Sequence, residues 1–392
     1  MKQVIEDMKS GEVRLIESPV PQCGSGEVLV KNVASLISPG TEKLLIEMGK
    51  KSLVGKALAR KDLVALAYEK AKREGFLNVF REAMARLDQP LPLGYSSAGD
   101  VLQTGRDVRG ISAGDRVACA GFNFASHAEV IAVPQELCVV LPPPASDKRA
   151  VSYEEASFVM LGGIALQGIR SAKLTFGENV VVVGLGLIGL LTVQIAKSYG
   201  CTTIGIDVNA EKVHRAKAMG CDAGFVLGQD DVEAAITHMT EGLGADAIIL
   251  TAATEDNAPV LLAEKIARKR GRIVLVGVSD LSLTRKTFWD KELTFTVSKA
   301  SGHSTEGRGS KFIPPVEVAR WTESRNLREF VRLVASGSVN VRDLITHRRP
   351  PLPLAKSPQL VIELGYQLLK RSIHRLAQRV RVIARRERRQ PR

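Results

Sequence analysis

The fold depends on one stretch, Asn179-Val-Val-Val-Val-Gly184-Leu-Gly186-Leu-Ile-Gly189-Leu-Leu-Thr-Val-Gln-Ile-Ala196. The valines predict a buried strand, and the apolar residues after the glycines have helical spacing. The glycines form the pattern G-x-G-x-x-G, which allows a tight turn, close backbone approach to a pyrophosphate and close packing of helix on strand. The N–H groups at the helix start would face the anion. The stretch predicts dinucleotide binding by Gly184, Gly186, Leu187, Ile188 and Gly189.

A second predicted strand, Thr202-Thr-Ile-Gly-Ile-Asp207, ends in an acidic residue 18 positions after Gly189. A carboxylate about 20 residues beyond the glycines accepts hydrogen bonds from the ribose 2′-hydroxyl and repels a 2′-phosphate. No arginine follows Asp207 immediately. We therefore expect NAD rather than NADP. Further cofactor contacts are expected where later strands end, because open α/β sheets bind ligands there: at Thr251, Gly277 and Val278.

A transmembrane helix is the alternative interpretation of the apolar run from Val180 to Ala196. The run is shorter than the ~20 residues that span a bilayer, and it contains glycines, Thr192 and Gln194. The N-terminus has no apolar segment of signal-peptide length. We therefore expect a cytoplasmic protein without a transmembrane segment. The five scattered cysteines form no C-x-x-C pair, so we expect them to be reduced and mostly buried.

The length of 392 residues exceeds the usual size of one hydrophobic core, so we expect more than one domain. Residues 1–152 show short strand patterns with glycine-rich turns, typical of a compact barrel, and contain a helical insertion at about 42–89. Residues 153–292 alternate strands with helices, which predicts an α/β fold with a parallel, doubly wound Rossmann sheet. Residues 293–347 are expected to return to the first domain, and 348–392 form a basic tail.

The order of barrel, nucleotide-binding domain and returning segment resembles the medium-chain dehydrogenase/reductase superfamily, of the alcohol dehydrogenase type, over about residues 10–347. The motifs that carry the resemblance are Gly94-Tyr-Ser-Ser-Ala-Gly99, Gly114-Asp-Arg-Val117, the glycine turn, Asp207 with Lys212, and Arg272-Ile-Val-Leu-Val-Gly277. The resemblance implies a GroES-like barrel, a cofactor contact at Lys212 and a substrate cleft between the domains. It also implies the oxidation of alcohols, or the reduction of carbonyls or activated alkenes, with NAD or NADP.

Many members of this superfamily hold a catalytic zinc ion through a cysteine, a histidine and a third ligand. Aligned by motif, this chain has Ser38, Tyr95 and Leu161 at the three positions. None is a suitable zinc ligand in this combination. The four-cysteine loop of a structural zinc site is also missing, because Gly114-Asp-Arg-Val117 runs directly into Ala118-Cys-Ala-Gly-Phe-Asn123. We therefore predict a protein without a metal site.

Without zinc, another group must donate hydrogen bonds to the reacting oxygen. Tyr95 is the leading candidate because its phenol can donate, although a barrel tyrosine with a satisfied hydroxyl is the alternative. Ser38, Thr41 and Ser96 are polar neighbours by motif. Glu42 could orient them or bind a substrate hydroxyl; its alternative is a carboxylate favoured by the dipole of a helix N-terminus.

The basic tail holds most of the excess charge, with +11 in residues 348–392 and +2 in the remainder. Its apolar residues recur at helical spacing, which predicts an amphipathic basic helix. Three roles stay open: docking on the protein or a partner, non-specific binding of anionic lipid or nucleic acid, or none. No motif for specific nucleic-acid recognition is present. The helical insertion could cap the cleft or join subunits of a homo-oligomer, and a surface elaboration is its alternative.

Three phrases resemble the first module of bacterial two-module oxidoreductases, in which a second dehydrogenase module follows: Leu91-Pro-Leu-Gly-Tyr-Ser-Ser-Ala-Gly99, Ala165-Leu-Gln-Gly168 and Trp321-Thr-Glu-Ser-Arg-Asn326. The chain departs from them after Thr346-His347, so a truncated or frame-shifted end is one explanation of the tail. We predict a zinc-independent, NAD-preferring oxidoreductase for an alcohol, carbonyl or sugar-derived small molecule. The alternatives are a bacteriochlorophyllide-dehydrogenase-like enzyme and a non-catalytic dinucleotide-binding protein.

Overall fold

The computed structural model describes residues 1–8, 10–38, 40, 42, 46–47, 50, 55, 89–143, 150–302 and 320–348. The chain divides into two compact units. The smaller unit includes Lys2–Ser18 and the described residues of Ile37–Leu93. Its three strands form an antiparallel sheet in the order β2-β1-β4, with β1 at Lys2–Asp7, β2 at Glu12–Glu17 and β4 at Leu91–Pro92.

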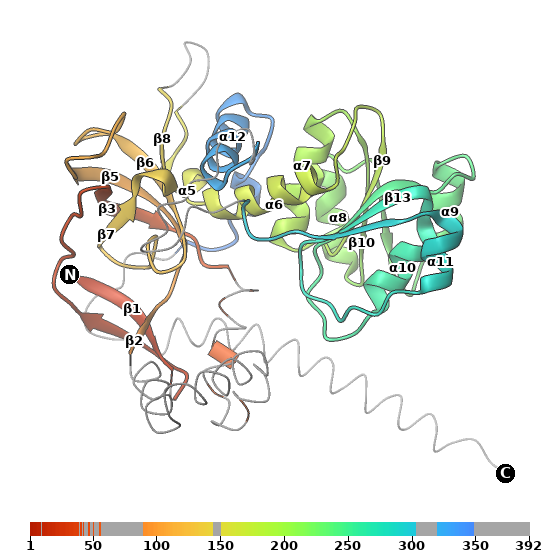
Figure 1. The fold of residues 1–392 in the computed structure, drawn as a ribbon, viewed down its shortest axis with the longest axis horizontal. Helices are drawn as coiled ribbons and strands as arrows, with labels where there is room; N and C mark the ends of the chain where they lie inside the picture. Colours follow the sequence, from red (N-terminus) through yellow and green to blue (C-terminus); the bar gives the residue numbers. More distant parts are fainter. Residues whose placement is uncertain are drawn as a thin grey trace, which may run out of the picture. The chain divides into compact units, whose positions relative to one another are not determined.

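The larger unit comprises Pro19–Leu36 and Gly94–Thr346, and it begins with a five-stranded antiparallel sheet in the order β7-β3-β5-β6-β8 (Figure 1). This sheet corresponds to the predicted barrel, and its inward side chains, such as Val28 and Val30, are fully buried. The strands are β3 (Glu27–Ser35), β5 (Ser96–Thr104), β6 (Arg116–Ala120), β7 (Val130–Pro134) and β8 (Cys138–Val140), with the short helix η1 (Gln135–Leu137) before β8.

The second sheet of this unit is a six-stranded parallel sheet in the order β11-β10-β9-β12-β13-β14. The glycine stretch supplies its central strand and the following helix, which confirms the predicted Rossmann sheet. The strands are β9 (Asn179–Val183), β10 (Thr202–Asp207), β11 (Ala223–Val226), β12 (Ala245–Leu250), β13 (Ala267–Leu275) and β14 (Thr294–Val297).

Helices cover both faces of the parallel sheet (Figure 1). Successive strand residues point to opposite faces. Val180 and Val182 accordingly share one core with α6, α7 and α8, whereas Val181 and Val183 share another with α9 and α10. The helices are α5 (Tyr153–Ala156), α6 (Val159–Ser171), α7 (Leu187–Ser198), α8 (Ala210–Ala218), α9 (Val232–Met239), α10 (Ala258–Ile266), α11 (Arg285–Lys291) and α12 (Glu323–Ser336).

The expectation that the chain leaves the Rossmann sheet before residue 293 is wrong. β14 pairs with β13 in parallel, with Phe295 opposite Ile273, and extends the sheet by one strand. The segment pairs because its alternating apolar residues have a core to contact: Leu293 and Phe295 pack against the cluster beneath α10, and the Phe295 ring lies 6.5 Å from that of Phe288.

Helix α12 returns the chain to α6. A β-carbon on Gly162 would lie 2.1 Å from the Phe330 ring. The close packing of α12 on α6 therefore requires glycine at this position. The short helix η2 (Arg342–Leu344) follows. No helix within the described ranges is long and apolar enough to cross a membrane.

The cysteines are unpaired, and four of the five are buried, as predicted. Cys119 and Cys138 lie opposite each other on β6 and β8, with sulfur atoms 4.0 Å apart. The contact with the Cys119 thiol, together with burial, raises the pKa of Cys138 well above its usual value, so the Cys138 thiol stays protonated.

Two predicted features fall largely outside the described residues. The basic tail is described only at its first residue, Arg348. Within the predicted insertion, the structure describes five helical residues and the bend at its last residue, Gln89. The helical residues are Glu42, Ile46, Glu47, Lys50 and Gly55.

Candidate functional site

The glycine turn between β9 and α7 is held by its own backbone. Gly184 has a φ of +96°, which L side chains rarely adopt, and a β-carbon there would lie 2.5 Å from the backbone nitrogen of Ala252. A β-carbon on Gly189 would lie 2.0 Å from the carbonyl oxygen of Gly184. The Thr251 hydroxyl donates to the same carbonyl oxygen at 2.5 Å. Packing therefore explains glycine at 184 and 189.

Gly186 differs from these two glycines. Its φ of −73° is accessible to any residue, and a β-carbon there would meet nothing within 4 Å. It caps the N-terminus of α7, where no side chain accepts from the first N–H groups, and Leu187 and Ile188 beside it are partly exposed. The space that a side chain would fill is open, which fits a pyrophosphate held against the helix N-terminus.

Asp207 is buried where β10 ends, 7% exposed, next to this turn. Its carboxylate accepts from the backbone N–H of Leu185 at 2.8 Å and from that of Asn209 at 2.9 Å. Lys212 approaches the same carboxylate at 3.5 Å. These contacts fix the carboxylate beside the glycines. Since each carboxylate oxygen has two acceptor directions, a ribose hydroxyl can still donate to it.

The carboxyl edge of the sheet continues through the ends of β12 and β13. A β-carbon on Gly277 would lie 2.0 Å from the carbonyl oxygen of Ala252, so residues 252 and 277 are in close backbone contact. Val278 donates its N–H to that oxygen at 3.1 Å, and 55% of the residue is exposed. The structure therefore brings Thr251, Gly277 and Val278 to the edge that holds the glycine turn.

Ser298 is a candidate that the sequence pattern did not indicate. Its N–H donates to Leu275, which places it at the end of β14, and its buried hydroxyl oxygen has no hydrogen-bond partner among the described residues. A buried hydroxyl without a partner calls for an explanation. An amide group of a bound nicotinamide would supply one. With the opening at Gly186 and the carboxylate of Asp207, the described residues fit a nicotinamide dinucleotide.

A hydrogen bond joins Ser96, which follows Tyr95, to Met160, which precedes Leu161. The Ser96 hydroxyl accepts from the backbone N–H of Met160 at 3.1 Å and donates to the carbonyl oxygen of Ser157 at 2.6 Å. This bond brings the second and third zinc-ligand positions, Tyr95 and Leu161, together, because it joins the start of β5 to the start of α6. Tyr95 is 6% exposed and Leu161 is fully buried in the apolar core.

The neighbourhood of Tyr95 differs from the prediction in one respect. Ser96 was expected as a polar group facing substrate, but its side chain is fully buried and its hydroxyl joins two segments of the backbone. The Ser301 hydroxyl, from the segment after β14, contacts the Met160 sulfur at 3.5 Å. The start of β5 and the segment after β14 thus meet at the start of α6, and the Ser301 hydroxyl also donates to the buried Glu323 carboxylate.

Ser38 and Glu42 belong to the smaller unit. The Ser38 N–H donates to the Glu42 carboxylate at 3.2 Å, and the Glu42 N–H donates to the Ser38 carbonyl oxygen at 3.1 Å. Both are buried. This arrangement matches the alternative interpretation of Glu42, a carboxylate that satisfies backbone donors at a helix start. Thr41 lies outside the described residues.

The three motif positions do not fit a zinc ion. Leu161 has no donor atom and is surrounded by apolar side chains, while a serine and a tyrosine are weak ligands for zinc without thiolate or imidazole partners. Within the described ranges, no three side chains of histidine, cysteine, aspartate or glutamate are grouped closely enough to hold a metal.

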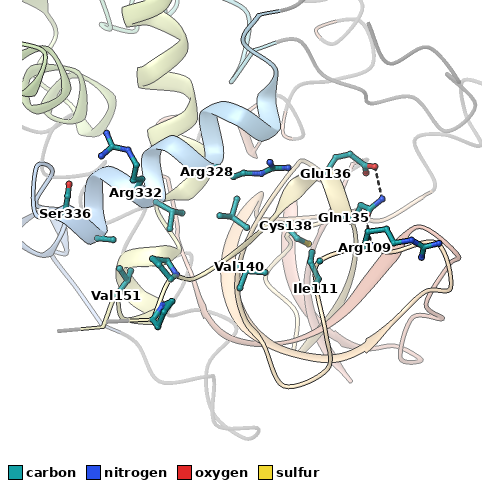
Figure 2. A pocket seen from close by; sticks show the side chains of 16 residues that line it. Arg109, Ile111, Gln135, Glu136, Cys138, Val140, Val151, Arg328, Arg332 and Ser336 are labelled. Carbon is teal, nitrogen blue, oxygen red and sulfur yellow. Dashed lines mark hydrogen bonds between the residues drawn. The ribbon is translucent and has the colours of Figure 1, made fainter. Parts of the chain in front are cut away.

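A cavity of about 1000 Å³ lies between α12 and the β8 side of the barrel sheet (Figure 2). Arg328 and Arg332 line it from α12, and Arg109 and Glu136 from the barrel, around an aliphatic floor that includes Val140. None of the predicted site residues lines it. The candidate site therefore rests on the sheet edge and not on this cavity.

The family model described as "Zinc-binding dehydrogenase" matches residues 188–311. Sorbitol dehydrogenase 2 of Saccharomyces cerevisiae is 27% identical, over 72% of this chain and 82% of that protein. D-guloside 3-dehydrogenase of Escherichia coli is 29% identical, over 72% and 75%.

Solved structures share the fold. Galactitol-1-phosphate dehydrogenase from Escherichia coli is 24% identical, with a TM-score of 0.63 over 88% of this chain and 91% of that chain. Alcohol dehydrogenase TADH from Thermus sp. ATN1 is 20% identical, with a TM-score of 0.69 over 95% and 97%. A Sinorhizobium meliloti dehydrogenase bound to NADP is 20% identical, with a TM-score of 0.64 over 88% and 91%.

Proposed function

The chain is a member of the medium-chain dehydrogenase/reductase superfamily, and on this premise we propose that it is an NAD-preferring oxidoreductase that acts without zinc on an alcohol or carbonyl of a sugar-derived substrate. The observation that carries the proposal is the open space at Gly186 beside the buried Asp207. The relatives named for sorbitol and a D-guloside support a polyhydroxylated substrate.

A bound nicotinamide would supply the hydride donor or acceptor for the substrate carbon. The chain itself supplies the other functions. The N–H groups at the start of α7 bind the pyrophosphate, and Asp207 accepts from the ribose and disfavours a 2′-phosphate. Gly277, Val278 and Ser298 lie at the edge expected to hold the nicotinamide end. In carbonyl reduction, the Tyr95 phenol donates a hydrogen bond and then its proton to the substrate oxygen and becomes a phenolate, and in alcohol oxidation the phenolate takes the hydroxyl proton.

Zinc independence rests on the residues at the three motif positions. Tyr95 replaces the Lewis acid as the group that stabilises charge on the substrate oxygen, because a buried phenol donates without competition from water. Elemental analysis of the purified protein tests this directly. One tightly bound zinc ion per chain, whose removal abolishes turnover, would overturn the proposed zinc independence.

The activity is tested with polyols and the corresponding ketoses as substrates, with NADH or NADPH followed by absorbance. We expect turnover with NADH, and a Tyr95→Phe variant should lose about 10²- to 10⁴-fold in kcat, the usual contribution of a general acid–base group. Its Kd for NADH should not change. Tight NADH binding without turnover of any substrate would favour a non-catalytic dinucleotide-binding protein instead.

A further inference from the structure

Three arginines gather on one indole ring at the end of α6. The guanidinium carbon of Arg170 lies 3.2 Å from the centre of the Trp321 ring, that of Arg325 4.4 Å and that of Arg320 5.7 Å. Arg170 comes from the last turn of α6, whereas the others flank the start of α12. We call these four side chains the arginine cluster.

In the described part of the chain, the arginine cluster has a nearby carboxylate, Glu329, but at longer range than an ion pair. None of its guanidinium groups forms an ion pair there; Arg170 donates to the Asn326 amide oxygen at 2.7 Å, and Arg325 donates to the Arg320 carbonyl oxygen. The neighbouring carboxylate, Glu329, is held by two hydrogen bonds from Arg332, at 2.7 and 2.8 Å.

Three guanidinium groups around one ring repel one another, and Glu329, which already pairs with Arg332, offsets only part of that repulsion. Burial lowers the pKa of Arg170, the charges of Arg325 and Arg320 add to that shift, and the charge of Glu329 opposes it. An arginine side chain stays protonated in proteins. The repulsion would be relieved by an anion that accepts from several guanidinium groups at once.

A hydrogen-bond network holds the arginine cluster in place. The Asn326 amide donates to the Gln167 side chain at 3.1 Å and to the Ser301 carbonyl oxygen at 2.7 Å, while it accepts from Arg170. Two sequence phrases that the dinucleotide site leaves unused, Ala165-Leu-Gln-Gly168 and Trp321-Thr-Glu-Ser-Arg-Asn326, meet through these bonds. The Arg170 guanidinium is therefore positioned before any ligand arrives.

The arginine cluster is separate from the glycine turn. Arg170 lies three residues before Lys173, whose carbonyl oxygen accepts from Arg272 at 2.8 Å, and Arg272 is level with Val180 at the start of β9. The C-terminal end of α7 lies at the same edge of the sheet, because β10 begins soon after it at Thr202, opposite Asn179. The glycine turn is at the other end of α7. A helix of 12 residues is about 18 Å long, since each residue adds about 1.5 Å. The pyrophosphate of a bound dinucleotide would not reach both places.

We propose that the arginine cluster is a second anion site, which binds the phosphate group of a small molecule. Guanidinium groups donate in forks that match phosphate oxygens, and a phosphate accepts from three donors where a single carboxylate has fewer oxygens to offer. The small extent of the cluster, three guanidinium groups around one ring, suits a compact anion better than an extended surface. Inorganic phosphate and a phosphate monoester share this chemistry.

The two tryptophans of the chain make the test direct. Trp289 is 75% exposed on α11, so Trp289→Phe leaves Trp321 as the single fluorescent reporter with little effect on the core. In this background, inorganic phosphate and glycerol phosphate are titrated in turn, with sodium chloride at matched ionic strength as the control. We expect a saturable change in Trp321 fluorescence with phosphate and none with chloride. The tighter of the two phosphates identifies the free ion or the ester as the ligand.

Arg325→Gln removes one guanidinium that stacks on Trp321, donates to the Arg320 carbonyl oxygen and forms no ion pair with the described residues, so it should fold normally. It should weaken phosphate binding at least tenfold and leave the Kd for NADH unchanged. Arg106→Gln, at a side chain 85% exposed beside Asp107, is the matched control for loss of one charge. Equal responses to phosphate and chloride, or unchanged phosphate affinity in both Arg325→Gln and Arg320→Gln, would overturn the second anion site. A change in NADH affinity is not needed for either result, so the test is independent of the oxidoreductase proposal.

Discussion

The Thr251 hydroxyl donates a 2.5 Å hydrogen bond to the carbonyl oxygen of Gly184, the same oxygen against which a β-carbon on Gly189 would collide. One carbonyl thus joins the end of β12 to the turn and to the first turn of α7. This bond gives a donor to the Gly184 carbonyl oxygen, which lies in the turn before the backbone hydrogen bonds of α7 begin. The glycine turn is therefore rigid in the protein alone, before a cofactor binds.

The glycines of the turn should separate into two classes by substitution. Gly189→Ala should lower the free energy of unfolding by about 1–3 kcal/mol or more, because overpacking against backbone forces a shift. Gly186→Ala should change it by less than about 1 kcal/mol, since the new methyl group meets no protein atom. The same variant should weaken NADH binding at least tenfold. Thermal unfolding and fluorescence titration measure both quantities; unchanged NADH affinity in Gly186→Ala would contradict the pyrophosphate assignment.

Asp207 should control the choice between the two nicotinamide cofactors. Asp207→Ser should reduce kcat/KM for NADH about 10- to 100-fold, the loss expected for hydrogen bonds to a charged group at about 1.5–3 kcal/mol. The efficiency with NADPH should fall less or rise, because the repulsive carboxylate is gone. Asp230→Ser is the matched control: its carboxylate accepts from the backbone N–H of Val226 at 2.6 Å at the end of the neighbouring strand. An unchanged NADH to NADPH ratio in Asp207→Ser would remove the assignment.

Ser96 should prove structural when it is compared with its neighbour. Ser96→Ala removes both hydrogen bonds at the start of α6 and should cost about 1–3 kcal/mol of stability, because buried backbone groups are left without partners. Ser97 is also fully buried, but its hydroxyl has no partner in the part of the chain that the structure describes, so Ser97→Ala should be neutral or stabilising. Urea unfolding distinguishes the two. A large loss of kcat in Ser96→Ala at unchanged stability would restore the catalytic role expected from the sequence.

The Glu329–Arg332 pair should make α12 sensitive to acid. Hydrogen bonds from Arg332 lower the pKa of Glu329 below its usual 4.5, although burial opposes the shift. The stabilisation is therefore present above about pH 4.5 and disappears as the pH falls through the lowered pKa. Since the pair is partly exposed, Glu329→Gln should cost no more than about 1 kcal/mol at pH 7 and almost nothing at pH 3. Equal losses at both pH values in urea unfolding would argue against the ion pair.

The sequence predicts best where local chemistry decides the structure. The run from Asn179 to Ala196 folds as a strand, turn and helix because each glycine and each buried valine is specified by near neighbours. Asp207 follows from the same rule, since a parallel strand next to β9 must end beside the turn. The fold class and the edge at which a cofactor binds could thus be derived without a structure.

The side of the site that would face substrate could not be derived in the same way. Ser96 looked like an active-site hydroxyl because the motif cannot show that α6, 60 residues later in the chain, approaches closely enough to bury it. Ser298 gave no signal, because a serine after a strand is common and only its buried, unpartnered oxygen is informative. Arg170 and Trp321 are likewise far apart in sequence, and their contact depends on the packing of α12 against α6.

The strand order β11-β10-β9-β12-β13-β14 has a consequence for the chain during synthesis. β9, β10 and β11 emerge from the ribosome first, and one edge of β9 stays unpaired until Ala245–Leu250 arrives as β12. That edge exposes backbone donors and acceptors next to a run of valines, a template for pairing between nascent chains. A translational pause between β11 and β12 should therefore lower the soluble yield more than a pause after β14, where the central strand is already enclosed on both sides.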